Sequence, residues 1–253
     1  MQITFLGTGT SQGVPIIACT CAVCSSINPK DKRLRSSIMI QTEGITIVVD
    51  SGPDFRQQML REKVMHLDGL VFTHEHKDHI AGLDDIRSFN YAQKEVIDVY
   101  AADRVQAAIH REFPYIFDEF KYPGVPEINL ITIDQNAFKI KGITLQPIEV
   151  MHMKMPVLGF RIGDFTYITD ANYISPEEKE KIMDSKIIVL NALRREKHVS
   201  HYNLQEAIDL VNEFKPEQAY FTHISHQLGL HDEVEKELPE NIHLAYDGLR
   251  LEL

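Results

Sequence analysis

The chain has few cysteines, few basic residues and no long apolar runs. No apolar stretch reaches the ~18 residues that a membrane span requires, so the sequence predicts no membrane partner. Its 26 lysine and arginine residues, against 37 aspartate and glutamate residues, give a formal net charge of −11. Because proteins bind a phosphate backbone through basic side chains, this balance disfavours an extended nucleic acid as the natural partner.

All three cysteines fall within one short stretch, Cys19-Thr20-Cys21-Ala22-Val23-Cys24. An odd count argues against a purely internal set of disulfides, and with no signal-peptide pattern it predicts a reducing, cytoplasmic compartment. Free thiolates are soft metal ligands, and a structural zinc site needs a fourth, for which His226 is the candidate. A reduced loop without metal is the alternative interpretation.

Length and composition suit one domain. With 253 residues, 43% of them hydrophobic, the chain can bury a full core, and we expect a single domain over residues 1–253. The order of elements is typical of two sheets packed face to face with helices outside. We expect strands near residues 2–6, 37–40, 45–49, 69–72, 96–100, 128–133, 143–149, 158–162, 165–169, 187–190, 217–221 and 248–252. We expect helices near residues 53–62, 79–88, 102–112, 176–184, 204–214 and 231–237.

The strongest signal in the chain is the run Thr73-His74-Glu75-His76-Lys77-Asp78-His79, in which three imidazoles and a carboxylate lie close together. A β-type run, Leu70-Val71-Phe72, precedes it, and Ile80-Ala81-Gly82-Leu83 suits the start of a helix. We therefore expect a strand-to-helix turn at a sheet edge, where open α/β folds bind ligands. There His74 and His76 can face one metal while Asp78 and His79 face a second.

Further ligand-type residues follow β-like runs later in the chain. His152, Asp170 and His223 each stand after such a run, and Asp50 ends the run at 45–49. Asp50 can equally be a turn residue. Each residue alone is ambiguous, because a single histidine at a strand end is more often a surface or core residue than a ligand.

The HxHxDH pattern resembles the signature of the metallo-β-lactamase superfamily, and the resemblance extends along almost the whole chain. It implies an α/β fold, a four-layer αββα sandwich. It also implies a supporting role for Asp50 beneath the metal loop. The implied ligands are His74, His76 and His152 for the first metal, Asp78, His79 and His223 for the second, and Asp170 as the bridge between them.

A closer resemblance comes from the cysteines. The N-terminal CxCxxC and the later THxSH tail are together similar to the phosphoribosyl cyclic phosphodiesterases of phosphonate breakdown, and the pyrroloquinoline quinone biosynthesis B proteins have a similar cysteine cluster. The first resemblance implies that His201, in an HxxH stretch, lies over the metals and assists catalysis, although it could also be a capping or exposed residue. It implies that Lys154, in an HxK pattern, contacts substrate. The implied ligands of a structural zinc are Cys19, Cys21, Cys24 and His226.

Two divalent ions roughly 3.5–4 Å apart form a clamp suited to phosphoryl transfer, and they acidify a bridging water. A carboxylate at position 170, where lactam-cleaving relatives often place cysteine, favours esters. We therefore expect a binuclear metal-dependent phosphodiesterase that cleaves a small phosphate ester, such as a cyclic ribosyl phosphate, by attack of a metal-bridging hydroxide. A sugar alkoxide leaves poorly unless it is protonated, which gives His201 a catalytic role beside Asp78. The metals would be zinc or manganese.

Other functions stay open. Transfer RNA 3′-end endonucleases share the metal motif, but the basic, glycine-rich arm with which they grip tRNA is not evident in this sequence. A cofactor-biosynthesis or sensor protein related to the pyrroloquinoline quinone B proteins would bind metals without hydrolysis. Thioester or lactone hydrolysis is a further alternative.

Positive charge near the site could come from Arg33, Arg35, Arg194 or Arg195, although solvated surface charge is the simpler interpretation for each. The aromatic and proline-rich segment 113–127 predicts an irregular insertion that could wall the active site or pack a homodimer. An ordinary surface loop is the simpler interpretation of this segment.

Overall fold

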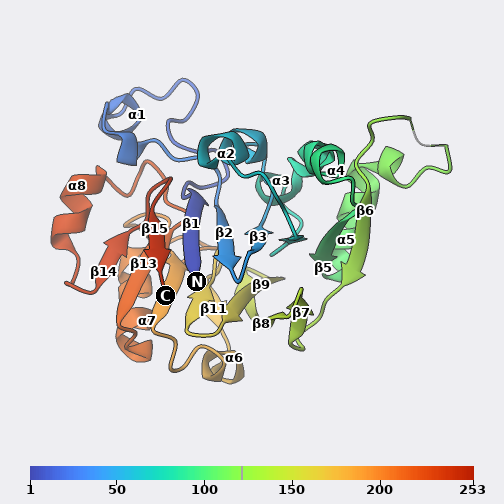
Figure 1. The fold of residues 1–253 in the computed structure, drawn as a ribbon. Helices are drawn as coiled ribbons and strands as arrows, with labels where there is room; N and C mark the ends of the chain where they lie inside the picture. Colours follow the sequence, from blue (N-terminus) through green and yellow to red (C-terminus); the bar gives the residue numbers. More distant parts are fainter. Residues whose placement is uncertain (121) are drawn as a thin grey trace.

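The structure is a computed structural model, and it describes residues 1–120 and 122–253. Two β-sheets pack face to face, and helices cover the outer face of each sheet (Figure 1). The four-layer αββα sandwich expected from the sequence is therefore confirmed.

The N-terminal half and the last strand build the first sheet. In spatial order its strands are β15 (Arg250–Glu252), β1 (Gln2–Gly7), β2 (Ser37–Thr42), β3 (Ile45–Val49), β4 (Gly69–Val71), β5 (Ile97–Ala101) and β6 (Ile128–Thr132). The pairs β15–β1, β1–β2 and β2–β3 are antiparallel, whereas β3, β4, β5 and β6 run parallel. The carboxyl ends of these four parallel strands therefore meet at one edge.

The C-terminal half builds the second sheet. In spatial order its strands are β11 (Tyr173–Ile174), β8 (Ile143–His152), β9 (Met155–Ile162), β10 (Phe165–Tyr167), β12 (Ile187–Asn191), β13 (Gln218–Thr222) and β14 (Ile242–Leu244), and β7 (Phe138–Ile140) pairs with β8. The strands β10, β12, β13 and β14 run parallel. This sheet therefore also presents several carboxyl ends at one edge.

Central strands are buried on both faces, which explains their continuous apolar sequences. In β3, Ile47 and Val49 pack between the sheets while Val48 packs under the helices of the first sheet. In β12, Val189 packs between the sheets and Leu190 lies in the cluster under the helices of the second sheet. A strand with two buried faces shows a run of apolar residues rather than an alternation.

The helices lie outside the sheets, and α7 shows why they form. Its apolar residues recur at helical spacing, and Ala207 and Val211 are buried against the second sheet. A capping box begins it: the Asn203 side chain accepts from the Glu206 backbone N–H, and the Glu206 carboxylate accepts from the Asn203 N–H. No described helix has the length and apolarity needed to cross a membrane. The helices are α1 (Ala22–Ser25), α2 (Phe55–Glu62), α3 (Lys77–Ile80), α4 (Arg87–Gln93), α5 (Asp103–Glu112), α6 (Pro176–Glu180), α7 (Leu204–Phe214) and α8 (His231–Val234).

The prediction of one continuous helix over residues 79–88 was wrong. The chain there forms α3, a 3₁₀ turn over Leu83–Ile86, and then α4. Gly82 causes the break, because its N–H donates to the Ser51 carbonyl oxygen, and a Cβ at Gly82 would lie 2.1 Å from the carbonyl oxygen of Gly52. The close approach of the two turns takes the backbone out of the helical path.

The described residues of the segment 113–127 are irregular, as expected, apart from a 3₁₀ turn over Pro114–Ile116. Lys121 lies outside the described residues. Together with residues of α4, Pro123, Gly124, Val125 and Glu127 line a hollow of about 740 Å³, and none of the candidate metal ligands is among its described lining residues. The two roles suggested for this segment, walling the active site and packing a homodimer, stay predictions.

Candidate metal centre

The histidine-rich run occupies the turn between β4 and α3. His76 is the N-cap of α3, and Asp78 and His79 lie in its first turn. The strand-to-helix turn expected from the sequence is therefore present, although the helix starts at Lys77 rather than near residue 79. Because His74 precedes the helix and His79 lies within it, the two side chains approach each other from different directions, with ring centroids 4.1 Å apart.

The three histidines assigned by resemblance to the first metal come together from the two sheets. The ring centroids of His74 and His76 are 4.7 Å apart, and those of His76 and His152 are 5.1 Å apart. His152 is the last residue of β8, whereas the other two follow β4 in the first sheet. The docking of the two sheets thus completes this group.

The three residues assigned to the second metal also converge. The candidate ligand atoms of Asp78, His79 and His223 lie within 4.8 Å of one another. The Nε2 atom of His79 is 3.2 Å from an Asp78 carboxylate oxygen. His223 follows β13 directly, so this group too draws on both sheets.

Asp170 lies between the two groups. One of its carboxylate oxygens is 3.3 Å from His79 Nε2 and 3.2 Å from His223 Nδ1. Its ligand atoms also group with those of His74 and His79, and separately with those of His152 and His201. A carboxylate shared in this way has the placement that a bridging ligand requires.

Several buried nitrogens of the cluster have no hydrogen-bond partner among the described residues: His74 Nε2, His79 Nε2 and His201 Nδ1. Leaving a buried polar atom unpaired costs about 1–3 kcal/mol, so such a concentration calls for an explanation. Imidazole nitrogens around a shared carboxylate are the donors that zinc, manganese and iron accept. The residues present therefore fit divalent cations.

Hydrogen bonds from outside the cluster orient the rings. His79 Nδ1 donates to Asp50 over 2.7 Å, His152 Nδ1 donates to the Ser200 carbonyl oxygen over 2.8 Å, and His74 Nδ1 lies 2.9 Å from Thr73 Oγ1. Each bond uses Nδ1 and leaves Nε2 for the cluster, which is the arrangement of a metal-binding histidine with an outer partner. Asp50 also accepts from the backbone N–H and the hydroxyl of Thr73, so it fixes the loop as well as the ring.

Burial and charge act differently on the rings. Burial places the pKa of His74 well below 6.5, which keeps the ring neutral and able to bind a cation. Burial also lowers the pKa of His79, but Asp78, Asp50 and Asp170 raise it more strongly, so that it lies well above 6.5. Although burial raises the pKa of Asp170, the nearby His223 and His79 hold it well below its ordinary value. The carboxylate is therefore ionised at neutral pH.

Left-handed backbone conformations recur around the cluster. Asp50, Asp170 and His223 have φ values of 67°, 55° and 54°, and Met153, directly after His152, has 58°. Such conformations cost a non-glycine residue about 1 kcal/mol or more, and they persist where the surrounding structure imposes them. Asp50, His223 and Met153 directly follow β3, β13 and β8, so these conformations occur where strands pass into the loops around the cluster.

His201 lies over the cluster. Its ring centroid is 4.6 Å from that of His152 and 4.8 Å from that of His223, and its Nδ1 is 3.8 Å from an Asp170 oxygen. Burial lowers the pKa of His201 to about 3. The ring is therefore neutral until an anion or a transferred proton reaches it.

Sequence reasoning missed Asn191, the last residue of β12. Its amide is fully buried and clamps the residue after Asp170: Asn191 Oδ1 accepts from the Ala171 N–H over 2.7 Å, and Nδ2 donates to the Ala171 carbonyl oxygen over 2.9 Å. The signal available in the sequence was a polar residue ending the apolar run Ile187-Ile188-Val189-Leu190.

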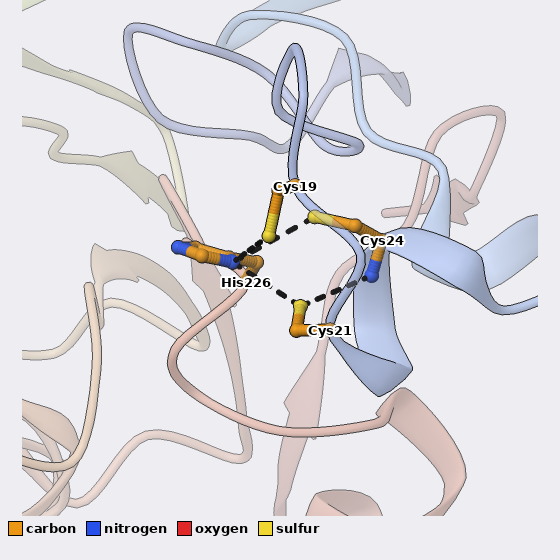
Figure 2. Close-up of side chains that lie close together, drawn as sticks. All are labelled: Cys19, Cys21, Cys24 and His226. Carbon is orange, nitrogen blue, oxygen red and sulfur yellow. Dashed lines mark hydrogen bonds between the residues drawn. The ribbon is translucent and has the colours of Figure 1, made fainter.

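The cysteines meet His226 in a separate cluster (Figure 2). His226 Nδ1 lies 3.4 Å from Cys19 Sγ, 3.3 Å from Cys21 Sγ and 3.6 Å from Cys24 Sγ. A hydrogen bond from the Cys24 backbone N–H, followed by the contact with His226, lowers the pKa of Cys21 to about 6, whereas burial raises the pKa of Cys24 to about 11. Three thiols and one imidazole around a common point are the donor set of a structural zinc site.

The basic residues considered from the sequence have varied surroundings. Arg33 is not a solvated surface residue: it is buried and donates to Thr8 Oγ1 and the Ala245 carbonyl oxygen. Arg35 pairs with Asp54. Lys154 is exposed, and its contact with substrate stays a prediction. The Arg194 guanidinium donates to the Gln227 side-chain oxygen, whereas Arg195 pairs with Glu237.

Comparisons with known proteins show what this chain is similar to. A family model for the beta-lactamase superfamily domain matches residues 46–224. A solved diphosphatase of the PhnP family is 37% identical, with a TM-score of 0.94, over 100% of this chain and 97% of its own. Zinc-bound PqqB from Methylobacterium extorquens is 18% identical, with a TM-score of 0.75, over 100% of both chains, a likeness that shows the fold alone.

The curated relatives are longer. The octanoyltransferase of Porphyromonas gingivalis is 38% identical over 252 residues, which are 98% of this chain but 51% of that protein. The chain thus spans about half the length of this relative. The match of the family model over most of the chain and the near-complete superposition on the diphosphatase lead to one conclusion: the chain belongs to the metallo-β-lactamase superfamily.

Proposed function

We propose that the protein is a phosphodiesterase with two divalent ions in its active site, acting on a small phosphate ester. The observation that carries this proposal is the position of Asp170, which lies within 3.3 Å of both His79 and His223 while buried imidazole nitrogens around it lack hydrogen-bond partners among the described residues. Two cations sharing one carboxylate would satisfy these atoms together.

Each group of side chains would hold one ion. His74, His76 and His152 would bind the first, Asp78, His79 and His223 the second, and Asp170 both. Zinc or manganese would suit these ligands. When bound, two such ions acidify water and stabilise the charge that develops on a phosphoryl group. Asp78 would contribute to catalysis through this role as a ligand.

The chain's own residues position the reaction. Asp50 and Ser200 hold the rings of His79 and His152 through their Nδ1 atoms, so the cluster is rigid before substrate arrives. His201 Nδ1 faces Asp170 at 3.8 Å and has no other described partner. An anionic phosphate at the cluster would favour the protonated ring, which can then give its proton to the departing oxygen.

A structural zinc at Cys19, Cys21, Cys24 and His226 completes the proposal. The three Sγ atoms already surround one imidazole nitrogen, and the lowered pKa of Cys21 supplies a thiolate near neutral pH. The zinc would fix the loop after β1 beside the loop after β13.

The net charge of −11 and the similarity to a diphosphatase support a small substrate over tRNA. Cyclic ribosyl phosphates are one class of such diesters. The relative named octanoyltransferase favours a second candidate, hydrolysis of an octanoyl thioester, because the chain matches about half of that protein. Hydrolysis of a thioester releases a thiolate, which is a good leaving group and needs no proton from His201. Diester hydrolysis and thioester hydrolysis therefore differ in their dependence on His201.

Turnover assays test the proposal. Purified protein should hydrolyse bis-p-nitrophenyl phosphate, 2′,3′-cyclic nucleotides or a ribosyl cyclic phosphate, and His76→Ala should abolish this activity. His66→Ala is the matched control, since His66 is exposed and pairs with Asp68 away from the cluster. Turnover of an octanoyl thioester alone, or diester turnover no higher than that of His76→Ala, would overturn the proposal.

A further inference from the structure

All three cysteines lie on one long loop, and Arg33 closes this loop at its base. The Arg33 N–H donates to the Val14 carbonyl oxygen, and the Val14 N–H donates to the Arg33 carbonyl oxygen, each over 2.8 Å. Residues 14–33 therefore form a loop whose two ends are held together, and Figure 1 shows its helix α1 away from the two sheets. Loops longer than about 12–15 residues are uncommon in compact domains and usually have a function.

The donor atoms on this loop and at His226 have the spacing of a tetrahedral site. His226 Nδ1 lies 3.3 to 3.6 Å from the three sulfurs, which Figure 2 shows gathered around it. With zinc–sulfur and zinc–nitrogen bonds of about 2.3 and 2.0 Å at tetrahedral angles, the sulfur and nitrogen atoms would be roughly 3.5 Å apart. The four donors therefore lie near the positions that a bound ion requires. This placement calls for contacts that hold the cysteine loop against the segment of His226.

Asp31 connects the cysteine loop to the segment that carries His226. One of its carboxylate oxygens accepts from Ser26 Oγ over 2.6 Å, and Ser26 stands two residues after Cys24. The other oxygen accepts over 2.8 Å from the backbone N–H of His231, which begins α8 five residues after His226. Asp31 is 2% exposed, so both bonds are shielded from water.

Arg33 holds the side chain of the same histidine. Its Nη2 donates to His231 Nδ1 over 3.1 Å, while its Nη1 donates to Thr8 Oγ1 over 2.8 Å and to the Ala245 carbonyl oxygen over 2.6 Å. A guanidinium can only donate, so His231 Nδ1 is the acceptor and the imidazole is neutral. Burial, followed by the charges of Arg33 and Lys30, lowers the pKa of His231 to about 4, which agrees with a neutral ring.

The guanidinium of Arg33 is buried against neutral acceptors. Burial lowers the pKa of Arg33 to about 10, against the raising effect of Asp247 and Asp31, so the group is charged at neutral pH. Well-packed apolar side chains often replace buried charged groups at no cost in stability. Stability alone therefore does not explain a buried cation here. Its position between the two segments that carry the donors gives it a second role.

We propose that three buried residues, Asp31, Arg33 and His231, hold the cysteine loop and the segment of His226 in place for a metal ion. They are called the Arg33 network here. Arg33 and His231 are positioning residues, because they bind no metal themselves and act through the segments that carry the donors. The proposal rests on the structural zinc of the proposed function, and it names residues outside the donor set that determine the affinity of that site.

Cobalt(II) in place of zinc tests the network at the cysteines alone. Cobalt bound by thiolates has a sulfur-to-cobalt charge-transfer band, whereas cobalt bound by histidine and aspartate has none. Titration of the reduced protein with chelator-buffered cobalt would therefore measure the affinity of this one site, and the intensity of the band at saturation would report sulfur coordination. Arg33→Met should weaken cobalt binding about tenfold or more and reduce the band, because the donors are no longer held in place.

Position 231 separates the loss of one hydrogen bond from a general loss of stability. His231→Leu removes the acceptor and should act like Arg33→Met. His231→Asn places an amide oxygen near the position of Nδ1 and should retain most of the affinity. Asn203→Ala is the control for destabilisation, because it removes the cap of α7 and leaves the Arg33 network intact. This control should lower the melting temperature without changing the affinity for cobalt or the band.

Unchanged cobalt affinity and an unchanged band in Arg33→Met would overturn the proposal. So would equal effects of His231→Leu and His231→Asn, or a loss of affinity in Asn203→Ala as large as in Arg33→Met. Absence of the band from the unmodified protein would instead overturn the structural metal site itself, and the role of the Arg33 network with it.

Discussion

Partners outside the cluster orient the histidines within it. Asp50 is buried beside His79 and accepts its Nδ1–H together with two bonds from Thr73. Such outer bonds typically contribute about 10–100-fold to metal affinity, because they fix the nitrogen that faces the ion. Neither Asp50 nor Asn191 would bind metal in the proposed site: Asp50 holds His79, a proposed ligand, and Asn191 holds Ala171, the residue after the proposed ligand Asp170.

Replacing His201 with alanine should lower kcat about 10²–10⁴-fold for a diester with an alkoxide leaving group. With p-nitrophenyl esters the loss should be much smaller, because p-nitrophenolate leaves without protonation. Steady-state kinetics on both kinds of substrate would measure the difference. An equal loss on both would show that His201 is not the proton donor.

Metal affinity should rise as the pH increases through and above 6.5. A proton on His79, whose pKa lies well above 6.5 because of three carboxylates, competes with the cation, and raising the pH removes it. His74 contributes little in this range, because burial has already lowered its pKa. Competition titrations against a chelating indicator between about pH 6 and pH 8 would measure the trend. An affinity independent of pH would contradict this account of His79.

Among the elements, α7 combines a structural task with a functional one. It begins three residues after His201, and its first N–H, that of Leu204, donates to the Arg194 carbonyl oxygen, so its start fixes the loop between Arg194 and His201. The helix therefore connects the core of the second sheet with the loop over the metal cluster.

Asn203→Ala should destabilise the protein by about 1 kcal/mol, because it removes the cap that satisfies the Glu206 N–H. For a chain of this size the melting temperature should fall by roughly 2–4 °C. Gln205→Ala is the control, since Gln205 is exposed and bonds only with Asp209 among the described residues. Thermal unfolding of the two variants measures both effects, and equal melting temperatures would refute the capping role.

The strands of the central sheets were predictable because both of their faces are buried, which leaves continuous apolar runs such as Ile45–Val49. The short strands β7, β11 and β14 were missed, whereas the equally short β4 and β10 were predicted because their runs of β-type residues continue to Phe72 and Ile168. The break at Gly82 was missed because it depends on a contact with Gly52, a turn distant in sequence. The positive φ values of Asp170 and His223 could not be predicted from the local sequence either, because the surrounding structure imposes them.

At the scale of the molecule, the candidate ligands come from both sheets and lie at the edge where strands of each sheet end. The sequence showed the ligand types, but their convergence depends on the docking of the sheets, and the clamp of Asn191 on Ala171 appears only in the folded chain. Metal binding should therefore stabilise the whole fold, because the unfolded chain has no preformed site.

Cys21→Ser should reduce the metal content from three ions per chain to two and lower the melting temperature. The loss should be confined to zinc, because the proposed active-site ions have other ligands. Elemental analysis of protein purified without added metal, combined with thermal unfolding, measures both effects. Unchanged stoichiometry would show that the cysteine cluster holds no ion.

The most direct test of the central claim is an anomalous-scattering map from crystals of the protein as purified, recorded at the absorption edges of zinc and manganese. The account predicts two peaks roughly 3.5–4 Å apart on either side of the Asp170 carboxylate, one near His74, His76 and His152 and the other near Asp78, His79 and His223. A single peak, or none at Asp170 in fully loaded protein, would contradict it.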